Sequence, residues 1–198
     1  MDRTPAAALQ KEASEASQEF RQPATLDSVA SFHRRFGVPI VGTPSMPSRA
    51  RMDLRLSLIE EEVAELRAAL DAGDIIEAAD ALADVQYVLG GTVHELGMGH
   101  CFAELVEEVQ RSNMSKACIS LDEAEKTVLH YRQTRGVEAK IEEKELDGKT
   151  AYLVTRASDG KTLKSIAYSP QGLAPILRQA GAQEADLDLS EELACAAA

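Results

Sequence analysis

Apolar residues recur most regularly between residues 55 and 96, where two successive segments each repeat them at helical spacing. The first segment starts near Ser48 and ends at Gly73, and its apolar stripe consists of Met52, Leu56, Ile59, Val63, Leu66 and Leu70. The second begins at Asp74, an N-cap residue with Glu77 three positions later, and its stripe consists of Ile75, Ala79, Leu82, Leu89, Val93 and Leu96. The short turn between the segments predicts an antiparallel helical hairpin.

Carboxylates accompany the apolar stripe on both helices of this hairpin. Glu61, Glu62 and Glu65 lie three or four residues apart on the first helix, and Asp80 and Asp84 lie one turn apart on the second. Because the middle of one antiparallel helix faces the middle of the other, these acids can meet. Carboxylates are costly to bury without a compensating cation, and magnesium prefers oxygen ligands. The pattern therefore predicts a magnesium site.

The segment before the hairpin predicts another helix. Its apolar spacing starts at the N-cap candidate Thr25 and ends at Gly37. His33 lies on the apolar side, and a core histidine is favoured over a metal ligand because no neighbour has metal-ligand spacing. Within the hairpin, Gly90 and Gly91 indicate either a close helix approach or room for a ligand.

A fourth helix is expected over residues 101–114, and its inner face consists of Phe102, Leu105, Val106 and Val109. One more turn of this face reaches Asn113 and Lys116, with Arg111 close by. These donors suit a negatively charged or hydrogen-bonding ligand. The competing interpretation is that Arg111 only pairs with Glu107 across one turn.

The pattern changes after residue 117. Ser120 and Glu123 form a capping box for a helix to about Gln133, and residues 137–170 alternate partially around two Asp-Gly turns, which predicts a three-stranded meander. The fold class predicted is an all-α core, a four-helix bundle, followed by a small α+β extension. The expected divisions are a disordered tail (1–22), the helical domain (23–117), the extension (118–181) and an acidic Ala-rich tail (182–198).

The amino-acid composition disfavours some classes of binding partner. A formal net charge of −12 disfavours nucleic acid, whose binding needs Lys and Arg, and no run approaches the roughly 18 apolar residues of a membrane span. Residues 1–22 lack the apolar segment of a signal peptide, and three cysteines without metal-ligand spacing indicate a reducing compartment, so a cytoplasmic location is expected. Two apolar faces on each hairpin helix predict a homodimer or homotetramer.

At this point the sequence resembles a known family. The segment EEVAE, residues 61–65, looks like the EExxE motif of the all-α nucleoside triphosphate pyrophosphohydrolases, the MazG-like superfamily, in which an ExxD motif on the next helix completes the magnesium site. The strings FHRRFGVPIVGTP, RLSLIEEEVAEL, DALADVQYVLGGTVHELG and EVQRSNMSK are similar, in this order, to the phosphoribosyl-ATP pyrophosphohydrolase-like branch. An isolated EExxE is common on solvated helices, whereas the joint pattern over about residues 27–116 is much more specific.

The resemblance implies hydrolysis of a nucleotide between its α- and β-phosphates, with Mg²⁺ as cofactor and Mn²⁺ as a substitute. The implied metal ligands are Glu61, Glu62, Glu65, Asp80 and Asp84, with Glu61 or Glu62 accepting the proton of the attacking water. The implied substrate contacts are Arg111 and Lys116 to phosphate, Asn113 to phosphate or base, and Tyr87 in the sugar or base pocket, unless Tyr87 is a core residue.

One position departs from the ExxD pattern. If Asp84 is the aspartate of this motif, the preceding acid belongs at position 81, which is Ala81. Asp80 is the expected replacement, and Glu77 with Asp80 is an alternative ExxD. Both candidates lie on the same helix as Asp84, so a metal site remains the expectation.

Three functions stay open. The first is a house-cleaning pyrophosphohydrolase for dUTP or another non-canonical nucleotide, which the resemblance favours modestly. The second is phosphoribosyl-ATP pyrophosphohydrolase of histidine biosynthesis. The third is a non-catalytic helical oligomerisation module, in which the acids are solvated and magnesium gives no stabilisation.

Overall fold

The computed structural model describes residues 21, 23–146 and 148–187. The sequence interpretation of residues 1–22 as a disordered tail falls outside these residues, apart from Arg21, as does the acidic tail beyond residue 187. The elements are α2 (Thr25–Phe36), α3 (Arg49–Ala72), α4 (Ile75–Glu95), α5 (Phe102–Met114), α6 (Leu121–Arg135), β1 (Ala139–Leu146), β2 (Lys149–Arg156), α7 (Leu173–Gln179) and α8 (Glu184–Leu187).

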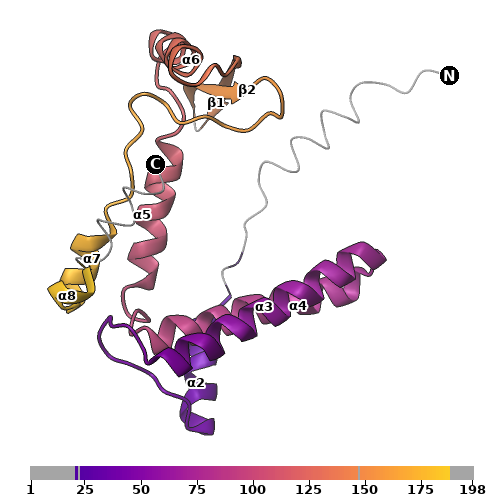
Figure 1. Cartoon of the computed structure of the whole chain (residues 1–198), viewed down its shortest axis with the longest axis vertical. Coiled ribbons are helices and arrows are strands. Elements are labelled where there is room, and N and C mark those ends of the chain that lie inside the picture. The colour runs from indigo at the N-terminus through magenta and orange to yellow at the C-terminus, as the bar shows by residue number, and fades with distance from the viewer. Residues whose placement is uncertain (1–20, 22, 147, 188–198) are drawn as a thin grey trace.

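The helical hairpin is confirmed: α3 and α4 run side by side as the longest helices (Figure 1). Gly73 ends α3 with a positive φ of 69°, which glycine adopts without strain. The Asp74 carboxylate then accepts hydrogen bonds from the backbone N–H groups of Ile76 and Glu77, at 3.0 and 3.2 Å. The predicted N-cap of α2 is wrong by one residue, because Ala24 takes that position and its carbonyl accepts the Ser28 N–H.

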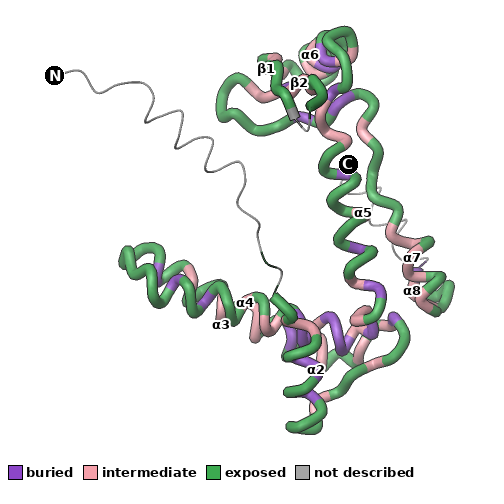
Figure 2. Tube along the Cα trace, turned by 180° about the vertical axis from the view of Figure 1, so that it is seen from behind, coloured by how far each residue is buried: buried purple, intermediate pink, exposed green. Residues whose placement is uncertain are grey.

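The apolar stripes of the hairpin remain largely uncovered in the single chain. The buried residues of its outer half are alanines, Ala69, Ala78 and Ala81, whose small side chains allow the two helices to approach closely. Most residues of both helices are instead exposed (Figure 2). The exposed large apolar residues of the hairpin include Leu56, Val63, Leu70, Ile75, Leu82 and Leu89. Among the described residues, no other element covers these apolar side chains of the hairpin.

The inner end of the hairpin packs on α2. At Gly91 an added Cβ would lie 2.7 Å from Arg55 Nη1 and 3.1 Å from His33 Nε2, and at Gly90 it would lie 3.2 Å from Val29 Cγ2. Both glycines therefore allow neighbouring helices to approach closely, which is one of the two roles that the sequence indicated for them. The approach brings α2, α3 and α4 together around a buried charged group.

That group is centred on Glu95, whose side chain is 2% exposed. Arg51 Nε and Arg55 Nε each donate a hydrogen bond to its carboxylate at 2.7 Å, and the Nη2 atoms of both arginines donate further bonds. His33 is buried beside Arg55 and donates from Nδ1 to the Pro39 carbonyl at 2.8 Å, which bears out the interpretation of His33 as a core histidine. These bonds connect α2, α3, the end of α4 and the loop after α2.

α5 extends away from the hairpin and runs beside α7 (Figure 1). Gly97, with a φ of 70°, permits the turn before it, since a Cβ there would meet the Thr43 carbonyl oxygen at 2.0 Å. The all-α core is thus confirmed, but over the described residues one chain packs only α2, α3 and α4 together. A four-helix bundle does not close within the single chain.

The C-terminal extension has a core formed by Cys118, Ala124, Val154 and Leu163. Ser120 is the N-cap of α6 as predicted, and its Oγ accepts the Glu123 N–H at 3.2 Å. The return bond of the predicted capping box is displaced by one residue, because the Glu123 carboxylate accepts the Ile119 N–H at 3.3 Å.

The sheet of the extension has two antiparallel strands, β1 and β2, and the predicted third strand of the meander is wrong. The following segment forms only an isolated bridge between Thr155 and Thr162, because the chain turns again after residue 165. Among the described residues, no helix is both long and apolar enough to cross a bilayer.

Replacing Glu95 with Gln should lower the free energy of unfolding by about 3–5 kcal/mol, because the buried Arg55 and the partly exposed Arg51 lose their counter-charge. Urea unfolding at pH 7 measures the loss. The control is Asp53→Asn in the exposed Arg49–Asp53 pair, which should cost less than about 1 kcal/mol. A Glu95→Gln variant as stable as this control would contradict the role of the cluster.

Acid should weaken the same cluster. Burial and then the neighbouring charges of Arg55 and His94 lower the pKa of His33 from 6.5, against a hydrogen bond to Pro39. Burial opposes the charged form of Glu95, but hydrogen bonds from Arg51 and Arg55 still hold its pKa below 4.5. In both cases the unfolded chain binds more protons, so the free energy of unfolding falls as the pH drops below about 6.5 and again below about 4.5.

Unfolding measured between pH 7.5 and pH 4 checks this sign. His33→Gln should remove the part of the slope near pH 6, whereas His130→Gln at an exposed position should retain it. Stability that rises on acidification would contradict the assignment.

Candidate active site

The five predicted metal ligands lie midway along the hairpin, with Glu61, Glu62 and Glu65 on α3 and Asp80 and Asp84 on α4. Glu62 is half-buried and the other four are exposed. Partial burial raises the pKa of Glu62, and so do the charges of Asp84, Glu65, Glu61 and Asp80, in that order. Glu62 therefore lies in the combined field of the other four carboxylates, and the hairpin brings acids of both helices toward one region.

These carboxylates are not gathered into a closed ligand set. Over residues 23–146 and 148–187, no three acidic, histidine or cysteine side chains are placed to hold a metal ion together. Like charges repel, and exposed side chains turn toward water when no cation draws them in. The donor type nevertheless fits magnesium, because all five groups offer oxygen atoms.

Position 81 cannot serve as a ligand position in this backbone. Ala81 is 3% exposed, so its side chain faces packed protein rather than the acidic face. Asp80 is exposed and its charge raises the pKa of Glu62, whereas Glu77 is not among the charges that act on Glu62. The geometry thus favours Asp80 over Glu77 as the replacement acid, which stays a prediction.

A cavity of about 330 Å³ adjoins the acidic face. Leu58, one turn before Glu62, and Tyr87, three residues after Asp84, both line it. The Tyr87 ring meets the Phe32 ring edge-on, with 5.9 Å between centroids. Tyr87 therefore packs against the core and also lines the cavity.

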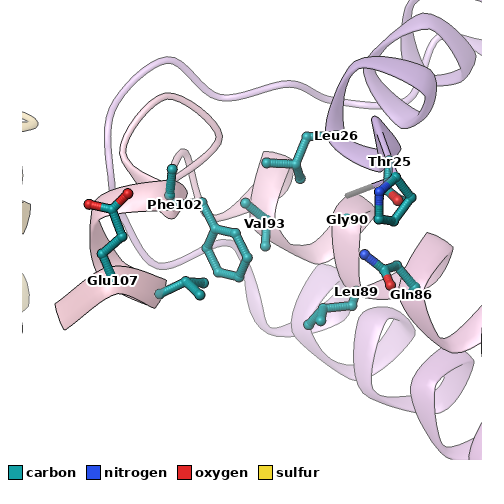
Figure 3. Close-up of a pocket in the computed structure, with 11 residues that line it drawn as sticks. Thr25, Leu26, Gln86, Leu89, Gly90, Val93, Phe102 and Glu107 are labelled. Atoms are coloured by element: carbon teal, nitrogen blue, oxygen red, sulfur yellow. The ribbon is translucent and has the colours of Figure 1, made fainter. Parts of the chain in front are cut away.

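A larger cavity of about 550 Å³ lies between α4, the start of α5 and the start of α2 (Figure 3). Leu26, Val93 and Phe102 point into it, and Leu89 continues it toward the exposed stripe of α4. Its charged lining residue is Glu107, so this cavity is unsuited to a triphosphate.

The three predicted donors at the end of α5 lie apart from the acids in the single chain. Arg111 pairs with Glu108, with Nε 2.7 Å from Oε2, rather than with Glu107. Lys116 Nζ donates to Asn113 Oδ1 at 2.8 Å. The charges that act on Glu62 are all carboxylates, so the structure does not bring the predicted phosphate contacts to the metal ligands within one chain.

Sequence reasoning missed the charged cluster beneath this site. Arg51 and Arg55 line the 330 Å³ cavity, yet their guanidinium groups are held by Glu95. One signal was present in the sequence: the two arginines lie four residues apart, beside the apolar stripe of α3. A glutamate at the end of an apolar helix gives no local sign that it is their partner.

Comparisons with known proteins agree with the resemblance. Residues 29–113 match the family described as phosphoribosyl-ATP pyrophosphohydrolase. A stretch of 99 residues is 37% identical to an uncharacterized protein of Acanthamoeba polyphaga mimivirus, and it covers 46% of this chain and 39% of the viral protein. The family match includes the hairpin and most of α5 and ends before the C-terminal extension.

Magnesium should raise the unfolding temperature if these acids bind it. At about 100 times its Kd, a single bound ion stabilises the folded state by about 2.7 kcal/mol. Glu62→Gln should reduce the magnesium effect and raise the unfolding temperature without magnesium, because it relieves the repulsion that raises the Glu62 pKa.

Thermal unfolding with and without MgCl₂ measures this effect of magnesium in the wild type and in Glu62→Gln. The matched control is Glu60→Gln, a neighbouring exposed glutamate of α3 that is not among the charges acting on Glu62. A wild-type unfolding temperature that does not change when magnesium is added would contradict the proposed metal site.

Proposed function

Because residues 29–113 match the phosphoribosyl-ATP pyrophosphohydrolase family, we propose that this protein is a magnesium-dependent nucleoside triphosphate pyrophosphohydrolase. It cleaves a nucleotide between the α- and β-phosphates and releases a nucleoside monophosphate and pyrophosphate. The observation that carries the proposal is the group of carboxylates on α3 and α4, where partial burial and then the charges of the other four acids raise the pKa of Glu62. Such a group calls for a cation.

Glu62, Glu65 and Asp84 would hold the metal, and Asp80 and Glu61 would complete the ligand set. Magnesium bound there would supply the positive charge that neutralises the triphosphate. Glu61 or Glu62 accepts the proton of the attacking water as its oxygen bonds to phosphorus, and the bridging P–O bond breaks so that pyrophosphate leaves with the electron pair. Partial burial, and then the charges of the neighbouring carboxylates, raise the pKa of Glu62, which makes this group a stronger base than an ordinary glutamate.

The nucleoside end of the substrate fits the 330 Å³ cavity beside the acids. Tyr87 and Phe32 give this cavity an aromatic wall, which suits a base or sugar. The substrate we propose first is dUTP or another non-canonical nucleotide, removed from the nucleotide pool. The second candidate is phosphoribosyl-ATP in histidine biosynthesis, the substrate after which the matching family is named.

A panel of nucleotides assayed for pyrophosphate release, with and without magnesium, tests the reaction. One nucleotide should be cleaved in a magnesium-dependent way, and phosphoribosyl-ATP belongs in the panel. Glu65→Gln should abolish the release while the far-UV circular dichroism stays helical, because one ligand loses its charge but the exposed position needs no repacking. Activity retained in Glu65→Gln would overturn the site. A wild type that is inactive on the whole panel favours a non-catalytic assembly module.

The active form we propose is a homodimer or homotetramer. The exposed stripes of α3 and α4 and the apolar 550 Å³ cavity form surfaces that a second copy can cover. A second copy also gives the α5 donors a route to the acids, since α5 leads away from the hairpin of its own chain (Figure 1). Asn113 and Lys116 of one copy then face the metal ligands of the other.

Leu82→Glu tests the assembly. This side chain is 57% exposed in the single chain, so a charge there is harmless to a monomer but costly in an interface between helices. Sedimentation should detect an oligomer for the wild type and a monomer for the variant. The control is Leu129→Glu on α6, which is 50% exposed and lies outside the hairpin. A monomeric wild type would contradict the proposal.

A further inference from the structure

Residues 165–172, here called the return segment, run back along α5 from the extension toward α7 (Figure 1). The segment starts where the Ser165 N–H donates to the Lys116 carbonyl at 3.2 Å. Farther along, the Ser169 N–H donates to Ser115 Oγ at 3.0 Å. The return segment is therefore hydrogen-bonded to the two residues that follow α5, Ser115 and Lys116.

The centre of this contact is Ser112, a polar residue of α5 that is only 2% exposed. Its hydroxyl lies 2.9 Å from the Tyr168 hydroxyl and 3.3 Å from Gln171 Oε1. A buried hydroxyl without a partner is costly, so the return segment satisfies a group that α5 cannot satisfy alone.

Glu108 provides the second place at which α5 binds the return segment. Its carboxylate accepts two hydrogen bonds from Arg111 and one from the Gly172 N–H at 2.7 Å. These bonds, those of Arg111 first, hold the pKa of Glu108 at about 2, so the group stays charged at any working pH. Arg111 in turn donates to Ser169 Oγ at 3.0 Å and to the Pro170 carbonyl at 2.9 Å.

The return segment occupies one side of α5 and leaves another open. The residues that bind it are Glu108, Arg111, Ser112 and Ser115. Asn113 is exposed, and Val106 and Val109 lie on its side of the helix at spacings of seven and four residues. The return segment thus holds the backbone that carries Asn113 and Lys116 from the opposite side of α5. The Asn113 side chain, which accepts a hydrogen bond from Lys116 Nζ, stays exposed to solvent.

We propose that the return segment, outside the family match, positions Asn113 and Lys116 for the phosphates of the substrate, with Tyr168 and Glu108 as positioning residues. The inference rests on the proposed function, because it assigns Asn113 and Lys116 to phosphate. It adds that the site depends on a segment that follows α6, β1 and β2 in sequence. Arg111 then contributes chiefly as a link between Glu108 and the return segment.

Tyr168→Phe tests the proposal in the full-length protein. The variant removes the hydroxyl but keeps the ring, over which Lys164 Nζ lies 4.4 Å from the centroid. KM for the nucleotide, and Kd for inorganic pyrophosphate with magnesium, should rise about two- to tenfold, because a hydrogen bond that orders the site is lost. The kcat value should change by less than about twofold, since no metal ligand moves.

Two further variants separate positioning from general stability. Tyr131→Phe removes another hydroxyl of the extension, one that accepts the Lys164 N–H, and should leave KM and Kd unchanged. In a Lys116→Gln background, Tyr168→Phe should have less than about half its effect in free-energy terms, because it acts through a residue already removed. Ser112→Ala should reproduce Tyr168→Phe from the α5 side.

Effects that add fully in the double variant, or an unchanged pyrophosphate Kd in Tyr168→Phe, would overturn the proposal. Failure of the proposed reaction looks different. In that case the wild type binds magnesium pyrophosphate but cleaves nothing on the panel, and the Kd comparison among the variants still decides the positioning role.

Discussion

The pairing of one buried carboxylate with two guanidinium groups determines how the helical core is arranged. Glu95 ends α4, and Arg51 and Arg55 reach it from the first turns of α3. Neither charge type could stay buried alone, so the ends of the hairpin helices must remain together and in this register. α2 adds His33 to the same group. The rigid inner end supports the outer half of the hairpin, where the acids lie without comparable support.

The sequence predicted the local features of the fold because they depend on neighbouring residues. Gly73 and Asp74 define the hairpin turn, and Ser120 with Glu123 defines the start of α6. Features that depend on distant residues were harder. The prediction of a third strand was wrong because an alternating pattern does not show whether a neighbouring strand is available for pairing. The direction of α5 was also not predictable, because it depends on the close approach of Gly97 to the loop at Thr43.

The candidate site was predictable in composition and less so in geometry. Spacing along α3 and α4 indicated which acids share a face, and the field at Glu62 agrees with that spacing. Spacing could not indicate that Arg111 is held by Glu108 and the return segment, because those partners lie up to 59 residues away in the chain. The sequence pattern of a hydrogen-bond donor at the end of a helix does not show whether that donor binds a substrate or another residue of its own chain.

The contact between Lys116 and Ser165 also bears on how such a chain can change over evolution. A hydrogen bond of 3.2 Å joins the points where the chain leaves α5 and where it comes back. The residues between these points contain α6, β1 and β2 with a core of their own. Because its two ends meet, this unit can be lengthened, shortened or exchanged without altering the spacing of the elements on either side. The extension thus has the anatomy of an insertion, to which new properties can be added while the helices beneath it keep their places.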